Sequence, residues 1–354
     1  MQRLPLKKDI ETKSILKITI EANRALAHLN GVAKIIPNQN ILINSLILQE
    51  AKDSSEIENI ITTHDELYLA NITNEKLSRE VKEVRNYKEA LLYGYEKVKS
   101  NHILTLNNIV DIQKILVAND AGIRKQSGTV LKNELTNEII YTPPQSYDDV
   151  MSLLKNMVDY INDDYLEDYD YLIKMAIIHF QFESIHPFYD GNGRTGRILN
   201  VLYLVLKNLL DLPILYLSRY IIEHKSDYYR LLQEVRVKNS WEEWIEFMLK
   251  AVIETSNETT ILIENIEKLM IYTKQKLKEK LPKIYSKDLL EVLFLHPYTK
   301  IEFLVDVLGL HRQTAVKYLK EISKIGILKE VKIGRNRYFV NVELFDLLKK
   351  AVNG

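Results

Sequence analysis

The sequence predicts a mainly α-helical protein with one short β-hairpin among its helices and a smaller C-terminal unit. Three observations support this fold class. The chain has 354 residues, of which 46% are hydrophobic, so two or three domains with sizeable cores can form. Glycine occurs only 11 times, and apolar residues recur mostly at the spacing of amphipathic helices. Strand-like stretches are confined to two short regions, 129–141 and 327–340.

Helical periodicity covers most of the chain before residue 275. We expect helices over residues 11–35, 41–70, 73–99, 106–117, 147–160, 169–184, 194–210, 217–237 and 241–273. One interruption is strand-like. Residues 129–132 and 138–141 flank a polar turn at 133–137, and Pro143 and Pro144 follow, which predicts a hairpin. A surface loop of strand-like composition is the alternative.

The C-terminal region reads as a separate unit that follows a lysine-rich stretch over 271–283. Glycine residues separate its expected helices and end the last of them, as helix-turn-helix units require. Three short helices are expected at 288–295, 300–308 and 312–324. A hairpin is expected over 327–340, with its turn at 334–336. The order of these elements resembles a winged helix-turn-helix.

The charge of this unit suggests a nucleic-acid partner. Residues 283–354 contain 13 Lys/Arg and 8 Asp/Glu, a net charge of +5, whereas the whole chain is neutral. Polar and basic side chains would line the front of the recognition helix and the wing, namely Arg312, Gln313, Thr314, Lys317, Arg335 and Arg337. This distribution suits a DNA backbone with base-edge contacts. Protein binding or homodimerisation is the alternative, because winged helices serve these roles too.

Composition excludes several classes of protein. The chain has no cysteine, so disulfides, thiolate metal sites and thiol nucleophiles are absent. Lys+Arg and Asp+Glu both total 48. The N-terminal residues show no apolar signal core, and no uncharged apolar run approaches the roughly 20 residues that span a bilayer. We therefore expect a cytoplasmic protein with no membrane partner.

Residues 186–197 read His-Pro-Phe-Tyr-Asp-Gly-Asn-Gly-Arg-Thr-Gly-Arg and concentrate groups suited to phosphate chemistry. His186 can accept a proton near neutral pH. Asp190 offers the hard oxygen ligands that Mg²⁺ prefers. The backbone of 191–193 can present N–H groups to an anion at the start of a helix. Arg194 and Arg197 lie three residues apart, so they share a helix face and can bind phosphate oxygens.

This stretch resembles the signature of the Fic (Fic/Doc) family, His-Pro-Phe-x-Asp/Glu-Gly-Asn-Gly-Arg-x-x-Arg, at every specified position. Most characterised members transfer AMP from ATP to a hydroxyl of a target protein. The resemblance implies that His186 is the catalytic base, that Asp190 holds Mg²⁺, with Mn²⁺ as an alternative, and that ATP is the substrate. It implies a nucleotide-binding set of Gly191, Asn192, Gly193, Arg194, Thr195, Gly196 and Arg197. It also implies that the hairpin is a flap that registers the target backbone.

A second motif, residues 54–59 (Ser-Ser-Glu-Ile-Glu-Asn), lies upstream. Ser54 and Glu58 are four residues apart and share a helix face, for which an ordinary solvated surface is the default interpretation. The motif is similar to the inhibitory helix of Fic proteins, Ser/Thr-x-x-x-Glu-Gly/Asn, which implies that Ser54, Glu58 and Asn59 form an inhibitory element. Glu58 would pair with Arg197 and compete with the γ-phosphate of ATP.

The adenine pocket is the least specific part of the site. Tyr228 and Tyr229 lie on a helix after the motif, where similar Fic proteins also have paired tyrosines. A tyrosine ring suits a base or a ribose, although ordinary packing is the alternative in a chain with 21 tyrosines.

These observations predict a Fic enzyme in three parts. Residues 1–100 would form an N-terminal helical region with the inhibitory helix, 101–275 the catalytic core, and 282–354 the winged helix. The expected reaction is transfer of AMP to a Ser, Thr or Tyr hydroxyl of a protein, which includes the enzyme itself. Two alternatives stay open: a DNA-binding regulator whose Fic part senses nucleotide, and a Fic enzyme that uses another nucleotide or removes AMP.

Overall fold

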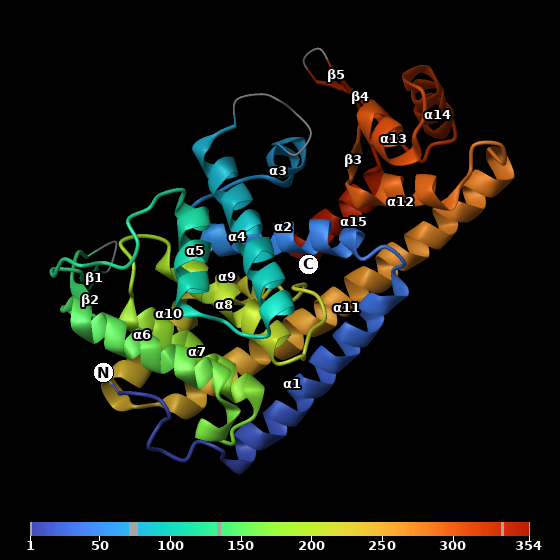
Figure 1. Cartoon of the computed structure of the whole chain (residues 1–354). Helices are drawn as coiled ribbons and strands as arrows, with labels where there is room; N and C mark the ends of the chain where they lie inside the picture. The colour runs from blue at the N-terminus through green and yellow to red at the C-terminus, as the bar shows by residue number, and fades with distance from the viewer. Residues whose placement is uncertain (1, 71–76, 133–135, 334–335, 354) are drawn as a thin grey trace.

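The structure is a computed structural model that describes residues 2–70, 77–132, 136–333 and 336–353. Helices dominate these residues, and the two small sheets lie at opposite ends of the molecule (Figure 1). The first half contains α1 (Lys13–Val32), η1 (Ala33–Ile35), α2 (Asn40–Ile57), α3 (His64–Ala70), α4 (Arg79–Asn101), α5 (Leu106–Val117), β1 (Leu131–Lys132), β2 (Ile139–Tyr141), α6 (Tyr147–Asn162) and η2 (Asp164–Leu166). The second half contains α7 (Tyr171–Ile185), α8 (Asn192–Leu206), α9 (Ser218–Glu223), α10 (Lys225–Lys238), α11 (Trp241–Lys280), α12 (Lys287–Leu295), β3 (Tyr298–Thr299), α13 (Ile301–Leu308), α14 (Arg312–Lys324), β4 (Lys329–Ile333), β5 (Asn336–Val340) and α15 (Val342–Asn353).

The centre of the fold is α7, whose side chains are buried on every side of the helix. Such a helix must be surrounded by others, and α6, α8, α11 and α1 pack against it. The indole N–H of Trp244 on α11 donates to the carbonyl of Ala176 on α7 at 2.9 Å, which fixes these two helices together. The last residue of α7 lies directly before His186, so the most deeply buried helix positions the predicted base.

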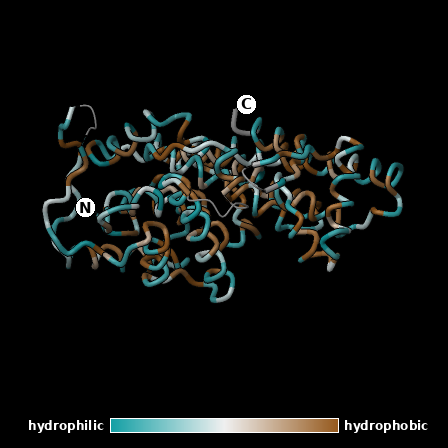
Figure 2. Tube along the Cα trace, turned by 90° about the horizontal axis from the view of Figure 1, so that it is seen from above, coloured by the Kyte–Doolittle hydropathy of each residue, from teal (hydrophilic) through white to brown (hydrophobic). Residues whose placement is uncertain are grey.

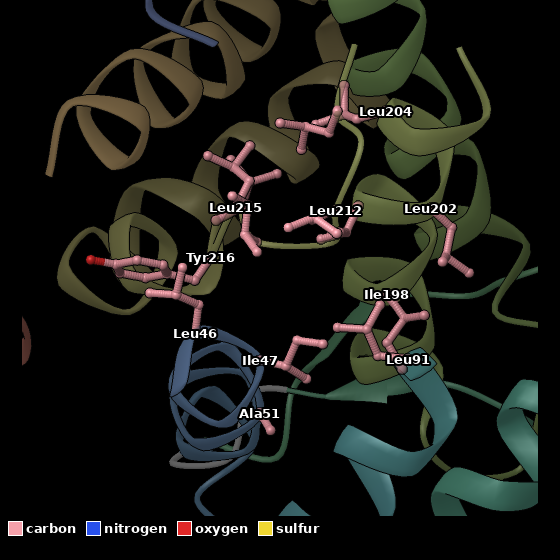
Figure 3. Packing of buried hydrophobic residues seen from close by; sticks show 14 of the residues in the cluster. Leu46, Ile47, Ala51, Leu91, Ile198, Leu202, Leu204, Leu212, Leu215 and Tyr216 are labelled. Carbon is pink, nitrogen blue, oxygen red and sulfur yellow. The ribbon is translucent and has the colours of Figure 1, made fainter. Parts of the chain in front are cut away.

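The helix that contains Ser54 is also held by apolar packing. Ile47 of α2 points toward Leu91 of α4 and Ile198 of α8, and Leu46 lies beside Tyr216, within one hydrophobic cluster (Figure 3). Hydrophobic and hydrophilic residues alternate along most helices (Figure 2), as expected of elements that bury one face. This packing places the C-terminal end of α2 against the N-terminal half of α8.

Two predicted helices are interrupted. The helix expected at 41–70 ends at Ile57 and resumes as α3, because Asn59 adopts a left-handed conformation with φ of 62°, which asparagine tolerates better than most residues. The helix expected at 217–237 is broken at His224, whose ring Nδ1 hydrogen-bonds the carbonyl of Tyr220 at 3.0 Å. Both predictions of a single helix were therefore wrong.

Other predictions differ at their boundaries. The helix expected at 241–273 continues to Lys280, because lysine favours helix, so most of the lysine-rich stretch is the charged end of this helix. The predictions for 73–76, the hairpin turn at 133–135, and Arg335 with the rest of the wing turn at 334–335 lie outside the described residues. The flap strands form as β1 and β2, which pair antiparallel.

The C-terminal region contains the three predicted helices followed by the predicted hairpin, β4 and β5. Two elements were not predicted: β3, which pairs with β5, and α15. The region packs on the rest of the chain, since α12 contacts α2 and α15 contacts α11. The amide of Gln49 on α2 donates to the carbonyl of Leu348 on α15 at 2.8 Å. Among the described residues, no helix has the length and apolar character to cross a bilayer.

Candidate active site

The motif loop connects α7 to α8 by two residues in the left-handed region. His186 has φ of 48°, and its N–H donates to the carbonyl of Phe182, which ends α7. Gly191 has φ of 78° and precedes α8, and a Cβ there would lie 2.7 Å from the Val117 side chain. Glycine is thus required at 191 both for its backbone conformation and for space. The turn aims the free N–H groups of the first turn of α8 into the site.

Side chains within the loop fix its shape. The Asn192 carboxamide accepts from the N–H of Phe188 and donates to the carbonyl of Phe188, both at 2.8 Å. The Phe188 ring is fully buried against Phe182. Asn192 therefore contributes to the predicted anion-binding turn through its backbone N–H, because its side chain is occupied within the loop.

Arg124 is a site residue that the sequence analysis missed. It is 1% exposed, and its guanidinium donates to the carbonyls of His186 (2.8 Å), Ile185 (3.2 Å) and Pro144. Its own N–H donates to the carbonyl of Pro187 at 2.9 Å. Arg124 thus joins the motif loop to the end of the hairpin segment. No local pattern marks it, since its partners lie 20 to 63 residues away.

His186 is placed as a neutral base. Its Nδ1 is buried and has no hydrogen-bond partner among the described residues. Burial, followed by the positive charges of Arg124 and Arg236, lowers the pKa of His186 to about 4. An imidazole in this state can accept a proton throughout the neutral range.

Asp190 and Arg194 lie side by side at the mouth of the site. Two-thirds of the Asp190 side-chain surface is exposed (67%), one oxygen accepts the N–H of Gly191 at 2.6 Å, and Arg194 lies 3.6 Å away. Arg194 is buried and forms an ion pair at 3.0 Å with Glu83 of α4, a partner that the sequence analysis did not predict. A nucleotide phosphate at Arg194 would therefore share this guanidinium with Glu83.

The structure brings the two predicted motifs together. Arg197 on α8 is 1% exposed, and its Nη2 lies 2.8 Å from a carboxylate oxygen of Glu58. The Nε of Arg197 donates to the Ser54 hydroxyl at 2.8 Å, and Nη2 also donates to the Ser54 carbonyl at 2.9 Å. The end of α2 therefore occupies most of the donor positions of Arg197.

The Glu58 carboxylate lies directly over the first turn of α8, where a side chain at Gly193 would collide with it. Burial alone would raise the pKa of Glu58, but the charge and hydrogen bond of Arg197 outweigh it and lower the pKa below its ordinary value. Glu58 is thus an anion bound at a helix N-terminus and paired with an arginine. Asn59 follows it in the left-handed turn.

The remaining motif positions pack inside the protein. Thr195 is fully buried, and a Cβ at Gly196 would lie 2.5 Å from Glu183, so Gly196 permits a close approach between α8 and α7. Glu183 was not predicted. One of its carboxylate oxygens is buried with no hydrogen-bond partner among the described residues, and burial raises its pKa to about 7.

The two tyrosines differ in their surroundings. Tyr228 is 1% exposed, and its hydroxyl hydrogen-bonds His179 Nε2 at 2.8 Å within the core. The structure corrects the prediction for Tyr228, because this ring offers no free face to a base. Tyr229 is 46% exposed, and its ring lies 5.2 Å from that of Tyr228. Only Tyr229 remains in our adenine-site hypothesis.

A cavity of about 450 Å³ unites the motif residues. Its lining includes His186, Asp190, Gly191–Arg194 and Glu58. The chemistry of Asp190 fits a divalent cation shared with phosphates, since it is a well-exposed carboxylate in this cavity and Mg²⁺ commonly binds through one or two carboxylates plus substrate oxygens. The described residues contain no group of three or more acidic or histidine side chains that could hold a metal by themselves.

The fold and the site define a class of mainly helical proteins in which a glycine turn at the start of a buried helix faces a cavity with a histidine. Within this class, three family profiles match the chain: Fic/DOC family N-terminal over 16–96, Fic/DOC family over 103–204, and the C-terminal domain of protein adenylyltransferase SoFic-like proteins over 269–344. The chain belongs to the Fic/DOC family.

Curated relatives and solved structures agree with this family. Protein adenylyltransferase fic-1 of Caenorhabditis elegans is 45% identical over 56 residues, or 16% of this chain and 11% of that protein. A probable protein adenylyltransferase of Aquifex aeolicus is 38% identical over 81 residues, or 23% of this chain and 24% of that protein. The chain thus spans a quarter or less of these relatives. A Fic family protein of Desulfovibrio desulfuricans has the same fold (TM-score 0.59, 21% identity, 96% of this chain and 98% of that one).

Proposed function

We propose that this protein is an adenylyltransferase that transfers AMP from ATP to a Ser, Thr or Tyr hydroxyl of a protein, itself included. His186 takes the proton of the acceptor hydroxyl, whose oxygen forms a bond to the α-phosphorus while the bond to the bridging oxygen breaks and pyrophosphate leaves. The observation that carries the proposal is the neutral His186 next to the anion-binding first turn of α8 in one cavity.

The other residues bind and orient the nucleotide. The N–H groups of 191–193 and the Arg194 guanidinium bind phosphate oxygens, and Arg197 binds the γ-phosphate once Glu58 has left it. Asp190 is the residue that would hold Mg²⁺ or Mn²⁺, which supplies neutralisation of phosphate charge when bound. The exposed ring of Tyr229 lines the nucleotide.

We further propose that Glu58, with Ser54 and Asn59, inhibits the enzyme. The γ-phosphate and the Glu58 carboxylate compete for one guanidinium, and in this structure the carboxylate holds it at 2.8 Å. The 35% of the Glu58 side-chain surface that remains exposed faces the site cavity, which gives the carboxylate a route out.

Label transfer tests the activity. The protein is incubated with α-labelled ATP and Mg²⁺, with and without a cell lysate, and label on protein bands is scored. His186→Ala should abolish transfer and leave ATP binding largely intact, because the phosphate-binding groups remain. Transfer by this variant at the parent rate would remove His186 from the base role. Release of free AMP from labelled protein would instead indicate hydrolytic removal of AMP.

DNA binding remains the second candidate, favoured by the exposure of Gln313 and Lys317 on α14. Two of the arginines expected to reach DNA are paired within the protein, Arg312 with Glu302 at 2.5 Å and Arg337 with Glu330 at 2.9 Å. DNA binding should fall steeply with salt, and Lys317→Ala should lower the slope by about one unit if this side chain contacts a phosphate. Absence of salt-dependent binding to duplex DNA would favour a protein-binding role.

A further inference from the structure

A second cavity, of about 730 Å³, lies behind the hairpin and is larger than the one that contains the motif. Residues of β2, α6, α7 and the end of α10 surround it, together with the first residues of the chain. Its lining includes Arg3, Tyr141, Asp149, Phe180, Arg236 and Trp241, but neither His186 nor Asp190. It is therefore a separate site, and Phe180 and Ser184 of α7, the helix that precedes the motif loop, form part of its wall.

Arg236 is an arginine without a counter-ion at this cavity. Its Nε donates to the Ser184 hydroxyl at 3.2 Å, and Nη2 lies 3.5 Å from the carbonyl of Glu183. Within the described part of the chain it forms no ion pair, and burial lowers its pKa. A cation removed from water is costly unless it is paired, so this position favours a ligand with negative charge.

The walls hold the guanidinium in a fixed orientation. Its Cζ lies 4.0 Å from the centre of the Tyr141 ring, and the Tyr141 hydroxyl donates to the carbonyl of Ser184 at 3.0 Å. Phe180 lies 5.9 Å away on another side and packs edge-on against Trp241 at 4.8 Å. Two aromatic rings therefore hold the guanidinium of Arg236 in place: Tyr141, which is fixed by its hydrogen bond, and Phe180, which is fixed by its packing against Trp241.

The charges of the cavity are also unbalanced. Arg3 adds a second cation, held by a hydrogen bond to the Ser152 hydroxyl at 2.9 Å. The acidic residue of the lining is Asp149, which accepts from the Ser146 hydroxyl at 2.6 Å and serves as part of the α6 cap. The two guanidiniums together suit a carboxylate.

The neighbouring hairpin indicates that the carboxylate belongs to a polypeptide. Leu131 and Lys132 of β1 pair with Tyr141 and Ile139, which leaves Ile140 as the extra residue of a bulge. The sheet has two strands among the described residues, so the other edge of β2 has no strand partner there. The carbonyl of Ile140 accepts from the Gln233 amide of α10 at 3.0 Å. An extended segment paired with this edge would continue past Thr142 into the cavity.

We propose that the cavity behind the hairpin binds an Asp or Glu side chain of an extended protein segment that lies along the edge of β2, with Arg236 as its counter-ion. The inference rests on the proposed function only in identifying this segment as part of the protein that is modified. It assigns a charge preference to the substrate: an acidic residue a few positions from the acceptor hydroxyl.

Tryptophan fluorescence provides a direct test without nucleotide. The chain has two tryptophans, of which Trp241 lines the cavity and Trp244 is fully buried. The probes are a blocked pentapeptide Val-Thr-Val-Glu-Val, its counterpart with Gln in place of Glu, and free glutarate. We expect a saturable change with the Glu peptide, roughly tenfold weaker binding of the Gln peptide and of glutarate, and loss of the signal in Trp241→Phe.

Two arginines on α10 form a matched pair of variants. Arg236→Gln should weaken binding of the Glu peptide roughly tenfold, whereas Arg230→Gln should not change it, because Arg230 is exposed and paired with Asp227 and Glu234. Arg236→Lys keeps the charge and should retain part of the affinity, so it provides the test if the Gln variant folds poorly.

Equal binding of the Glu and Gln peptides, unchanged binding by Arg236→Gln, or no saturable signal with the Glu peptide would overturn the proposal. Equal binding of glutarate and the Glu peptide would overturn the assignment to a protein segment. Since the assay contains no ATP, its failure is distinct from failure of the transfer reaction.

Discussion

At the scale of single residues, the contacts that hold the motif loop and its arginines join segments far apart in the sequence. The spacing of His186, Asp190 and Arg197 specifies a loop followed by a helix, and the structure has that geometry. The ion pair of Arg194 with Glu83 joins residues 111 apart, and the Arg124 hydrogen bonds join the loop to other segments. Such contacts depend on tertiary packing, which no local pattern encodes.

The pH dependence of transfer tests the state of His186. Its pKa of about 4 lies below the ordinary value of 6.5, so the base stays neutral as the pH falls to about 5 and is protonated only near 4. The value of kcat/KM for ATP reports the free enzyme, so with saturating Mg²⁺ it should show no loss of activity centred on pH 6.5. An acid limb with its midpoint at 6 to 7 would contradict the buried, neutral histidine.

Arg124 should act by positioning the motif loop. Arg124→Gln leaves up to three carbonyls without their donor, each at a cost of about 1–3 kcal/mol, and frees the loop that holds His186. We expect kcat to fall by about tenfold or more while KM for ATP changes little, since the α8 N-terminus is intact. A rise of KM for ATP by a similar factor, with unchanged kcat and an unchanged melting temperature, would argue against this role.

At the scale of elements, most helices and both hairpins were predictable, but their interruptions were not. The apolar spacing over 41–70 continues through residues 58–63, where Asn59 reverses the chain. A left-handed asparagine is compatible with either a helix end or a solvent-exposed turn, so periodicity alone does not detect it. The break matters, because it ends α2 at Ile57 and leaves Glu58 free to face Arg197.

The α2 helix also contains a buried carboxyl that should destabilise the fold at neutral pH. Asp53 is 1% exposed, and burial raises its pKa to about 7 from 3.8. Between pH 4 and 7 the unfolded chain has lost this proton while the folded chain keeps it, so the free energy of unfolding falls as the pH rises. The side chain of the Asp53→Asn variant does not ionise. Its free energy of unfolding should therefore rise relative to that of the parent, by about 1–4 kcal/mol from pH 4 to pH 8. Urea unfolding at both pH values measures this, and a pH-independent difference would refute the assignment.

At the scale of the whole molecule, the C-terminal region was expected to be a separate unit, yet it packs against α2 and α3. Tyr298 donates to Asp65 of α3 at 2.7 Å, and the rings of Tyr68 and Phe345 pack at 5.9 Å. The two unpredicted elements supply these contacts, because Tyr298 lies on β3 and Phe345 lies on α15. Removal of residues after Lys280 would therefore uncover parts of α2 and α3.

Cooperative unfolding tests whether this region is part of the same folding unit. Leu348 on α15 is fully buried, so Leu348→Ala should cost about 2–5 kcal/mol. Val342→Ala is the matched control, since Val342 is exposed at the start of the same helix and should cost well under 1 kcal/mol. Calorimetry should show one transition that shifts to lower temperature in the first variant. Two transitions, of which only one shifts, would indicate an independent domain.

We expect that the ion pair between Glu58 and Arg197 holds an otherwise competent site inactive. The measurement is the initial rate of label transfer from α-labelled ATP, at saturating ATP and Mg²⁺, by the parent, Glu58→Gly, Glu56→Gly and Glu58→Gly with Arg197→Ala. Glu56→Gly is the control, because it makes the same substitution at the same helix end and removes a partly buried ion pair with Lys52, while the contacts of Arg197 remain. We predict a large gain for Glu58→Gly alone, no gain for the control, and loss of the gain in the double variant. Equal rates for the parent and Glu58→Gly would contradict inhibition by Glu58.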